Sequence, residues 1–135
     1  ARLCPPVYGQ IASIGALDTP QSYFTEVRNE YIARRDYAVT RLNAMQGVYS
    51  PTPMGAFYTI ARIPVDDAER FAKWMLTDFR LNGETTMVTP AKSFYKTPGF
   101  GADQIRIAYV LGIPELEKAF DSLEAGLKEY PGKTV

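Results

Sequence analysis

The clearest strand pattern in the chain is Gln104-Ile105-Arg106-Ile107-Ala108-Tyr109-Val110-Leu111. Because successive side chains of a strand point to opposite faces of a sheet, Ile105, Ile107 and Tyr109 are expected on one face. Arg106 falls on the other face, inside a run that is otherwise apolar. The pattern predicts a sheet with one buried face and one face that carries a charged side chain.

The segments on either side of this strand predict its neighbours. Thr85-Thr86-Met87-Val88-Thr89 is a short β-branched run, expected to form a strand that Pro90 stops. Residues 92–102 are typical of a loop, and the strands on its two sides are expected to pair antiparallel. Pro114 suits the first turn of a last helix, which Tyr130-Pro131-Gly132 ends. The buried stripe of that helix is expected to be Leu116, Phe120, Leu123 and Leu127.

The N-terminal part of the chain begins with two helical patterns. A short helix is expected over residues 6–17, with Ile11 and Ile14 as its apolar contacts. Asp18-Thr19-Pro20 suits the cap and first turn of a long amphipathic helix that ends near Gly47. The apolar residues of the long helix recur at spacings of three, four or seven: Phe24, Val27, Tyr31, Ala38, Leu42 and Met45.

The middle of the chain adds a strand and a helix. The run 56–63 is rich in β-branched and aromatic residues and predicts a strand. Asp66 and Glu69 stand at the spacing of a capping box before a helix that is expected to end at Asn82-Gly83. The buried stripe of this helix is expected to be Phe71, Ala72, Met75 and Phe79. The element order predicts a single α+β domain over residues 1–135, in which helices cover one face of a short, mostly antiparallel sheet.

The overall composition argues against several functions. The 15 basic and 15 acidic residues give a formal net charge of +0, which argues against nucleic acid or an anionic membrane as a partner. The chain has no histidine, so it lacks the commonest metal ligand and the base of a Ser/His or Cys/His pair. Its single cysteine, Cys4, has no partner for an internal disulfide. We expect a cytoplasmic protein with no metal site and no catalytic residue in this chain.

Two interpretations of Arg106 are open at this point. Its guanidinium could face solvent from the uncovered side of the sheet, or it could bind a carboxylate through a bidentate pair of hydrogen bonds. The preceding loop contains Ser93-Phe94-Tyr95 and Pro98-Gly99-Phe100-Gly101. A loop with glycines and aromatic residues beside a strand arginine is a plausible wall of a small-molecule site.

Short motifs run through the whole chain in a recognisable order. They are ARLCPP (1–6), GQIA (9–12), MGAFY (54–58), FA (71–72), VTPA (88–91), SFY (93–95), PGFG (98–101) and IRIAYV (105–110). In this order and spacing the chain resembles class I and II pyridoxal-phosphate aminotransferases, and is most similar to those of the aspartate, tyrosine and aromatic types. The resemblance covers essentially all 135 residues and is to the C-terminal (small) domain of these enzymes.

The resemblance implies a role for three residues. Arg106 matches the arginine that binds the α-carboxylate of the substrate, and Phe94 and Tyr95 lie in the segment that lines the substrate. The intact enzyme would transfer an amino group from an amino acid, aspartate or a similar L-amino acid, to a 2-oxo acid. It would be a homodimer that uses pyridoxal 5'-phosphate, held by an N-terminal large domain outside this chain.

The chain also differs from the aminotransferases that it resembles, in one turn and in its lysines. Many relatives have Pro-Gly after the second strand, where this chain has Pro90-Ala91-Lys92, so the local turn is expected to differ there. None of the six lysines lies in a segment that matches the Schiff-base lysine: Lys73, Lys92, Lys96, Lys118, Lys128 and Lys133. The chain alone is therefore expected to be inactive and to bind no cofactor.

A second hypothesis belongs to a different class of protein. The chain could be a stand-alone carboxylate-binding or interaction domain without catalysis. If it is instead a part of an aminotransferase, the first half of the long helix should lack its native partner. Apolar surface around Phe24 and Tyr31 is then expected to be exposed and to promote self-association.

Overall fold

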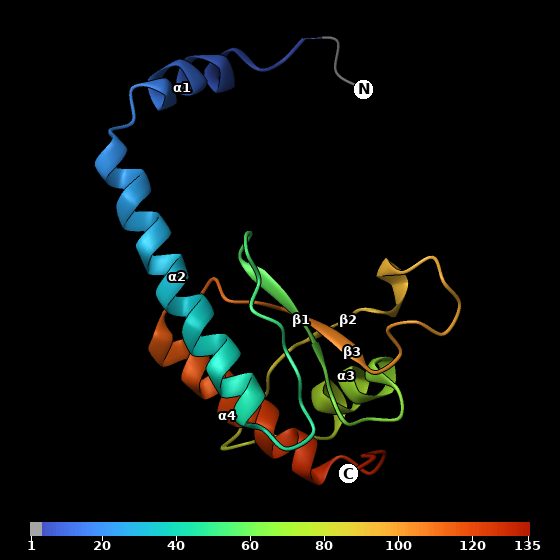
Figure 1. Ribbon diagram of the computed structural model, residues 1–135. Helices are drawn as coiled ribbons and strands as arrows, with labels where there is room; N and C mark the ends of the chain where they lie inside the picture. The colour runs from blue at the N-terminus through green and yellow to red at the C-terminus, as the bar shows by residue number, and fades with distance from the viewer. Residues whose placement is uncertain (1–3) are drawn as a thin grey trace. The chain divides into compact units, whose positions relative to one another are not determined.

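Residues 4–135 form four α-helices and a small antiparallel sheet. The computed structural model describes residues 4–135, and the chain divides into a smaller N-terminal unit that ends at Glu30 and a larger unit, Tyr31–Val135. The observed order is α1, α2, β1, α3, β2, a short 3₁₀ helix η1, β3 and α4 (Figure 1). This order confirms the predicted succession of helices and strands and the α+β class.

The N-terminal unit contains helix α1 and the first part of helix α2. Helix α1 (Val7–Leu17) buries none of its side chains among the described residues. Ile11 and Ile14 are 61% and 66% exposed, so the prediction that they make apolar contacts was wrong for the part of the chain described. The hydroxyl of Thr19 donates to the carbonyl of Ala16 at 2.7 Å, so Thr19 closes the end of α1 instead of capping α2.

Helix α2 (Gln21–Ala44) contributes to the core of the larger unit through its second half. Ala38 and Leu42 are fully buried, and Tyr31 packs partly against the same core. Phe24, in the N-terminal unit, is 50% exposed, as expected, whereas Tyr31 is half-buried, so the expectation of exposure was wrong for Tyr31. The chain turns after the helix at Gly47, whose φ of +74° favours glycine.

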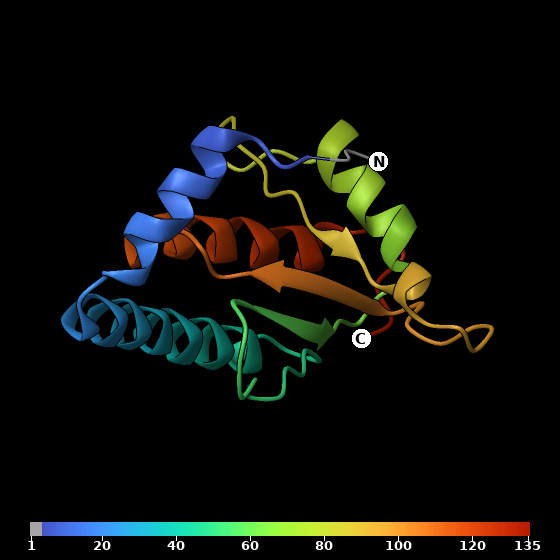
Figure 2. The same ribbon diagram turned by 90° about the horizontal axis from the view of Figure 1, so that it is seen from above.

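The sheet has three strands with β3 at its centre. Strands β1 (Tyr58–Arg62), β3 (Gln104–Ala108) and β2 (Thr89–Pro90) lie in the order β1-β3-β2, and both pairs are antiparallel (Figure 2). Ile105 is completely buried and Arg106 is exposed. The predicted division of this strand into an apolar face and a face that carries Arg106 is therefore confirmed.

The second strand is much shorter than its sequence predicted. Only Thr89–Pro90 pairs with β3, whereas the expectation was a strand over residues 85–89 that Pro90 would stop. Pro90 is tolerated inside the pair because it stands opposite Ile105, whose amide points toward β1 and not toward β2. Residues 85–88 are held away from β3 because the hydroxyl of Thr85 donates to the carbonyl of Met75 at 2.8 Å and that of Thr86 to the carbonyl of Ala119 at 3.1 Å.

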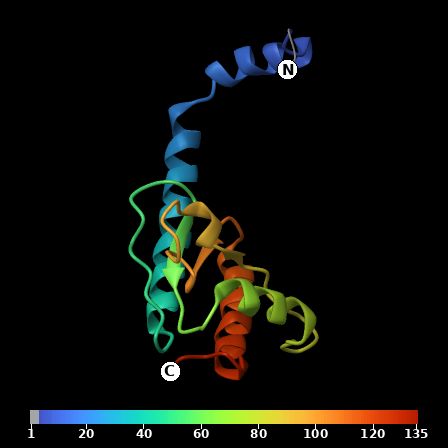
Figure 3. The same cartoon turned by 90° about the vertical axis from the view of Figure 1, so that its right-hand side faces the viewer.

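Helices α3 (Ala68–Thr77) and α4 (Ile113–Glu129) complete the larger unit. Helix α4 runs alongside the second half of α2, and Arg41 of α2 joins the two helices by ion pairs to Asp121 at 2.6 Å and Glu124 at 3.4 Å (Figure 3). Helix α3 ends at Thr77, earlier than the predicted end at Asn82-Gly83. A side chain satisfies a carbonyl at the end of the helix, because Arg80 donates to the carbonyl of Leu76 at 3.0 Å.

The start of α3 differs by one residue from the predicted capping box. The N-cap is Asp67, whose carboxylate accepts from the amides of Glu69 and Arg70 at 2.9 and 3.0 Å. Asp66 is occupied elsewhere, because it accepts a hydrogen bond from the hydroxyl of Tyr130 at 3.0 Å. Asp66 and Asp67 could each cap this helix. The hydrogen bond from Tyr130, at the C-terminal end of α4, engages Asp66 and leaves Asp67 as the cap.

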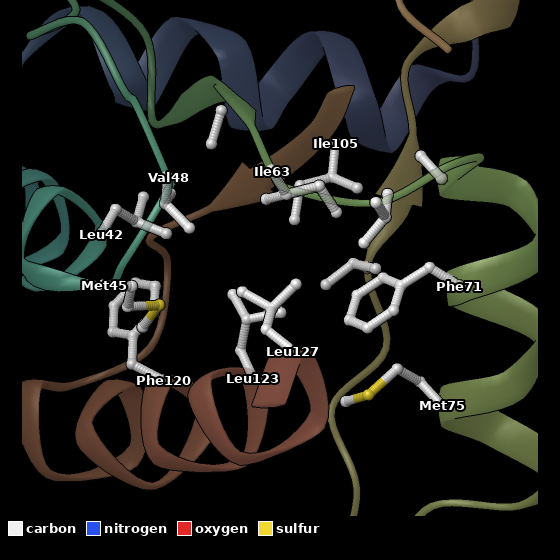
Figure 4. Packing of buried hydrophobic residues seen from close by; sticks show 14 of the residues in the cluster. Leu42, Met45, Val48, Ile63, Phe71, Met75, Ile105, Phe120, Leu123 and Leu127 are labelled. Carbon is white, nitrogen blue, oxygen red and sulfur yellow. The ribbon is translucent and has the colours of Figure 1, made fainter. Parts of the chain in front are cut away.

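The core lies between the sheet and the helices α2, α3 and α4. Figure 4 shows side chains from these four sources directed into one interior. The labelled residues are Leu42, Met45, Val48, Ile63, Phe71, Met75, Ile105, Phe120, Leu123 and Leu127. The residues of both predicted stripes are confirmed as buried, all eight of them, although Phe79 lies just beyond the end of α3. Helix α4 approaches α3 closely at Gly126, where an added Cβ would collide with the sulfur of Met75.

The cap at Asp67 makes the stability depend on pH. Hydrogen bonds from the backbone, that of Arg70 first, lower the pKa of Asp67 below its usual value of 3.8, against a smaller effect of burial. A lowered folded-state pKa contributes stability that is present above the unfolded pKa and is lost as the pH falls through the folded pKa. Replacement of Asp67 by Ala should lower the free energy of unfolding by about 1 kcal/mol near neutral pH.

Urea denaturation at neutral pH and near pH 3 measures this effect, and the difference between parent and Asp67→Ala should shrink at the lower pH. Asp67→Asn is the control, because an amide oxygen still accepts the backbone bonds but does not titrate. If the parent and Asp67→Asn lost stability equally on acidification, the assigned role of the carboxylate would be wrong.

Candidate functional site

Arg106 occupies the centre of the open face of the sheet. It lies in the middle of β3, opposite Ile60 of β1 on one side and Thr89 of β2 on the other. The side chain is exposed, while Ile105 before it is fully buried and Ile107 after it packs partly against the core. The guanidinium is therefore presented on the face that the helices of the larger unit do not cover.

Two aromatic rings stand beside the guanidinium. The Cζ atom of Arg106 lies 5.0 Å from the ring centroid of Phe94 and 5.6 Å from that of Tyr58. Both distances are within the range of cation–π attraction. Phe94 is the last residue of η1 (Lys92–Phe94), so the loop and the sheet together place the ring. Contacts of this kind restrict where the guanidinium can point and leave its N–H edge available for hydrogen bonds.

Tyr58 was missed by the sequence analysis. It pairs with Ala108 in β1–β3, which makes it the diagonal neighbour of Arg106 on the same face. The motif that contains Tyr58 was noted, but only the register between β1 and β3 shows that its ring reaches Arg106. No signal in the sequence specifies that register.

Tyr95 has contacts of a different kind from those of Phe94. Its hydroxyl donates to Oε1 of Gln104 at 2.7 Å, and its ring packs edge-to-face on Phe100 at 4.9 Å between centroids. An added Cβ on Gly101 would come within 2.5 Å of the ring. The structure brings Phe94 next to Arg106, whereas these contacts of Tyr95 stabilise the loop. A contact between Tyr95 and a ligand stays a prediction.

The electrostatic surroundings of Arg106 differ from those of other arginines. Within residues 4–135, no carboxylate lies within ion-pair distance of Arg106, whereas Arg35, Arg41 and Arg70 each have an acidic partner. A guanidinium that is flanked by rings and has no internal counterion can accept a carboxylate from outside the chain. Bidentate geometry then fixes the orientation of that carboxylate.

The lysines do not form a cofactor site with the rest of the described chain. All six are exposed. Three have surface partners: Lys92 faces Asp67 at 3.9 Å, Lys128 pairs with Glu124 at 2.7 Å, and Lys133 donates to the carbonyl of residue 128 at 2.9 Å. A Schiff-base lysine needs an enclosed pocket with groups for the cofactor ring and phosphate, and the residues described here do not fit that requirement.

Two further kinds of feature are absent from residues 4–135. The described chain contains no group of three or more His, Cys, Asp or Glu side chains that could hold a metal ion. None of its helices is long and apolar enough to cross a membrane.

Comparison with known proteins gives a consistent set of relatives. The chain is 31% identical over 140 residues to an aspartate aminotransferase of Rhizobium meliloti, a match that covers 95% of the chain and 32% of that protein. It is 32% identical over 130 residues to aromatic-amino-acid aminotransferase 2 of Thermococcus litoralis, covering 93% of the chain and 31% of the relative. No family model matches the chain.

Solved structures agree with the sequence comparison. An alanine aminotransferase from Pyrococcus furiosus superposes with a TM-score of 0.79 at 30% identity, over 95% of this chain and 31% of that one. An aromatic aminotransferase from Pyrococcus horikoshii gives a TM-score of 0.74 at 33% identity, over 93% of this chain and 32% of that one. Both the fold and the sequence of the chain are therefore similar to a part of an aminotransferase.

Within that class, the chain is similar to aspartate and aromatic-amino-acid aminotransferases over almost all of its own length. It spans about a third of the length of the curated relatives that it matches, in agreement with the predicted C-terminal piece. The α+β fold with a short antiparallel sheet is the fold of the matching part of these structures.

The loop beside Arg106 provides a test of its packing. Gly101→Ala should destabilise the protein by about 2 kcal/mol or more, because a φ of +76° is strained for alanine and the new methyl group collides with the ring of Tyr95. Gly99→Ala is a matched control, since its φ of +79° is equally strained but nothing lies within 4 Å of the added Cβ. Thermal and urea denaturation measure both variants. Equal destabilisation by the two substitutions would show that Tyr95 does not pack as described.

Proposed function

We propose that this chain is the C-terminal, substrate-binding part of a pyridoxal-phosphate-dependent aminotransferase. The intact protein would transfer an amino group between an amino acid and a 2-oxo acid. The observation that carries the proposal is the exposed guanidinium of Arg106, flanked by Phe94 and Tyr58 and without an acidic partner among the described residues. In this chain Arg106 would bind the α-carboxylate of the substrate.

The relatives support recognition of the group that all their substrates share. Their names specify aspartate, aromatic amino acids and alanine, which differ in the side chain. Every one of these compounds has an α-carboxylate next to the amino group that is transferred. A planar guanidinium with two parallel N–H groups suits this common feature and does not select a side chain. Aspartate or a similar L-amino acid is the proposed substrate.

The residues of this chain would contribute binding and orientation. Arg106 would hold the carboxylate by a pair of charge-assisted hydrogen bonds, which fixes the position of the α-carbon. Phe94 and Tyr58 would keep the guanidinium in place and reduce its contact with water, which strengthens the ion pair. Tyr95 is proposed to contact the substrate from the same loop. None of these groups would transfer a proton.

The remainder of the chemistry would come from outside the chain. Bound pyridoxal 5'-phosphate supplies the electron sink for transfer of the amino group. Because the exposed lysines of this chain do not fit a Schiff-base site, the cofactor would be held by the N-terminal large domain of the intact protein. The isolated chain would then be inactive. We further propose that the intact enzyme is a cytoplasmic homodimer, as the resemblance implies.

The role of Arg106 can be tested in the intact enzyme. Arg106→Ala should raise the KM for the amino acid by about 100-fold or more, since one bidentate charged pair is lost. Arg106→Lys keeps the charge but cannot form the parallel pair, and it should recover only part of the loss. Steady-state kinetics with the amino acid and the 2-oxo acid varied in turn give both values. An unchanged KM in Arg106→Ala would rule out this assignment.

Titration of the isolated chain separates the two classes of function. If it is a part of an aminotransferase, calorimetry should detect neither tight binding of pyridoxal phosphate nor turnover. Tight binding of dicarboxylates without cofactor would favour the stand-alone carboxylate-binding domain. Tight cofactor binding by this chain would contradict the proposal that a domain outside this chain holds the cofactor.

The exposed apolar residues of the N-terminal unit predict self-association of the isolated chain. Ile14 and Leu17 of α1 are 66% and 85% exposed, and Phe24 in α2 is 50% exposed. Sedimentation velocity should show mass that rises with protein concentration, and Ile14→Glu with Phe24→Glu should shift the chain toward monomer. Leu76→Glu, at a position that is 44% exposed on α3, is the control and should have little effect. A parent chain that stays monomeric at all concentrations would contradict the prediction.

A further inference from the structure

The entry to β1 contains an alanine in a conformation that favours glycine. Ala56 has a φ of +61°, in the left-handed region that is unfavourable for an alanine and that glycine adopts freely. The preceding residue is a glycine, Gly55, yet its φ is not positive. Strained residues of this kind persist only where contacts with the surrounding structure hold them. The contacts that hold Ala56 therefore indicate what the strain is for.

Tyr109, the residue directly after β3, makes these contacts. Its hydroxyl donates to the carbonyl of Ala56 at 3.2 Å, and its amide donates to the carbonyl of Phe57 at 2.9 Å. Tyr109 is 1% exposed, and burial raises the pKa of its hydroxyl above the usual value of 10.0, against a smaller lowering by Arg35. The hydroxyl therefore keeps its proton near neutral pH and can donate it. One buried residue thus binds two successive carbonyls at the start of β1.

The segment that leads into β1 has its other attachment at Ser50. The side chain of Asn43 donates to the carbonyl of Ser50 at 2.9 Å and accepts from its amide at 2.8 Å. The hydroxyl of Ser50 also lies 2.9 Å from that of Thr59. No hydrogen bond within the described chain involves residues 52–55, and Met54 is 95% exposed. The bond from Tyr109 is therefore the contact that fixes the chain just before β1.

The residues after Ala56 lead directly to the candidate site. The ring of Phe57 packs edge-to-face on that of Tyr58, with 5.5 Å between the centroids and 89° between the planes. The ring of Tyr31, in α2, lies 6.3 Å from that of Phe57. Tyr58 in turn lies 5.6 Å from the guanidinium of Arg106. A change in the backbone at Ala56 would therefore move Phe57 and release the ring of Tyr58.

We propose that the hydroxyl of Tyr109 positions the carboxylate site by holding Ala56 in its left-handed conformation. Phe57 and Tyr58 are then kept where Tyr58 restrains the guanidinium of Arg106. The inference rests on the proposed function, in that Arg106 binds the substrate. Tyr109 itself touches no substrate, because its side chain is part of the core. A phenylalanine would fill nearly the same volume without the bond, so the role belongs to the hydroxyl and not to the ring.

Steady-state kinetics of the intact enzyme test the proposal. Tyr109→Phe should raise the KM for the amino acid about fivefold with kcat nearly unchanged, since one neutral hydrogen bond behind the binding group is lost. Ala56→Gly, added to Tyr109→Phe, should recover roughly half of that loss or more, because glycine adopts a positive φ without help from the hydroxyl. Tyr130→Phe is the matched control. It deletes another buried hydroxyl, bonded to Asp66 at 3.0 Å, and should leave the KM unchanged.

A second measurement, on the 135-residue chain, does not depend on activity. Nuclear Overhauser effects between the ring of Tyr58 and the side chain of Arg106 report the contact between them. These effects should weaken in Tyr109→Phe and recover when Ala56→Gly is added. In Tyr130→Phe they should equal those of the parent chain.

The outcomes distinguish this inference from the proposed function. An unchanged KM in Tyr109→Phe, in an enzyme whose KM rises in Arg106→Ala, would overturn the positioning role and leave the function standing. An equal rise in Tyr130→Phe, or no recovery with Ala56→Gly, would also overturn it, because the effect would then be general destabilisation. A weakened contact between Tyr58 and Arg106 in the Tyr109→Phe chain would support the positioning role even if Arg106→Ala showed the proposed function to be wrong.

Discussion

The alternation of side chains along β3 connects the core to the candidate site. Ile105 is completely buried among the helices, and Arg106 faces the opposite direction because successive residues of a strand must do so. β3 is also the one strand bonded to both of the others, so its position is set from two sides. A shift of its register by one residue would place the guanidinium in the core and an isoleucine on the open face. The packing energy of the core thus fixes where the positive charge points.

The neighbours of an arginine decide what it does in this protein. Arg41 has two acidic partners, Asp121 and Glu124, and joins α2 to α4. Arg106 has aromatic rings beside it and no acidic partner among the described residues. Rings attract a guanidinium without satisfying its hydrogen-bond donors, so the side chain is held while its N–H groups stay available for an anion. The same side chain is structural in one place and suited to binding in the other.

Several features of this chain are consistent with a piece of a larger protein. The apolar residues of α1 are exposed, the β2–β3 ladder ends early, and Arg106, the proposed carboxylate-binding residue, lies on the uncovered face of the sheet. Each of these is costly or without purpose in a self-sufficient domain. The aminotransferase relatives, about three times as long as this chain, account for all three together.

The sequence by itself determined the order of the helices, the apolar stripes predicted for α3 and α4, and the faces of β3, because these depend on residue spacing within one element. It also proposed Arg106 and, by resemblance, Phe94 as substrate-binding residues, and the structure places the two side by side. Local pattern could not choose between Asp66 and Asp67 as the cap, because the bond from Tyr130 is made by a residue far along the chain.

Only the tertiary structure placed Tyr58 beside Arg106, because that contact requires the register between two strands. It likewise shortened the strand predicted at residues 85–89. The hydroxyls of Thr85 and Thr86 donate to carbonyls on α3 and α4, so this segment is attached to the helices and not to β3. Spacing along a chain specifies which face a side chain occupies, but the partner across that face is chosen by how the elements pack.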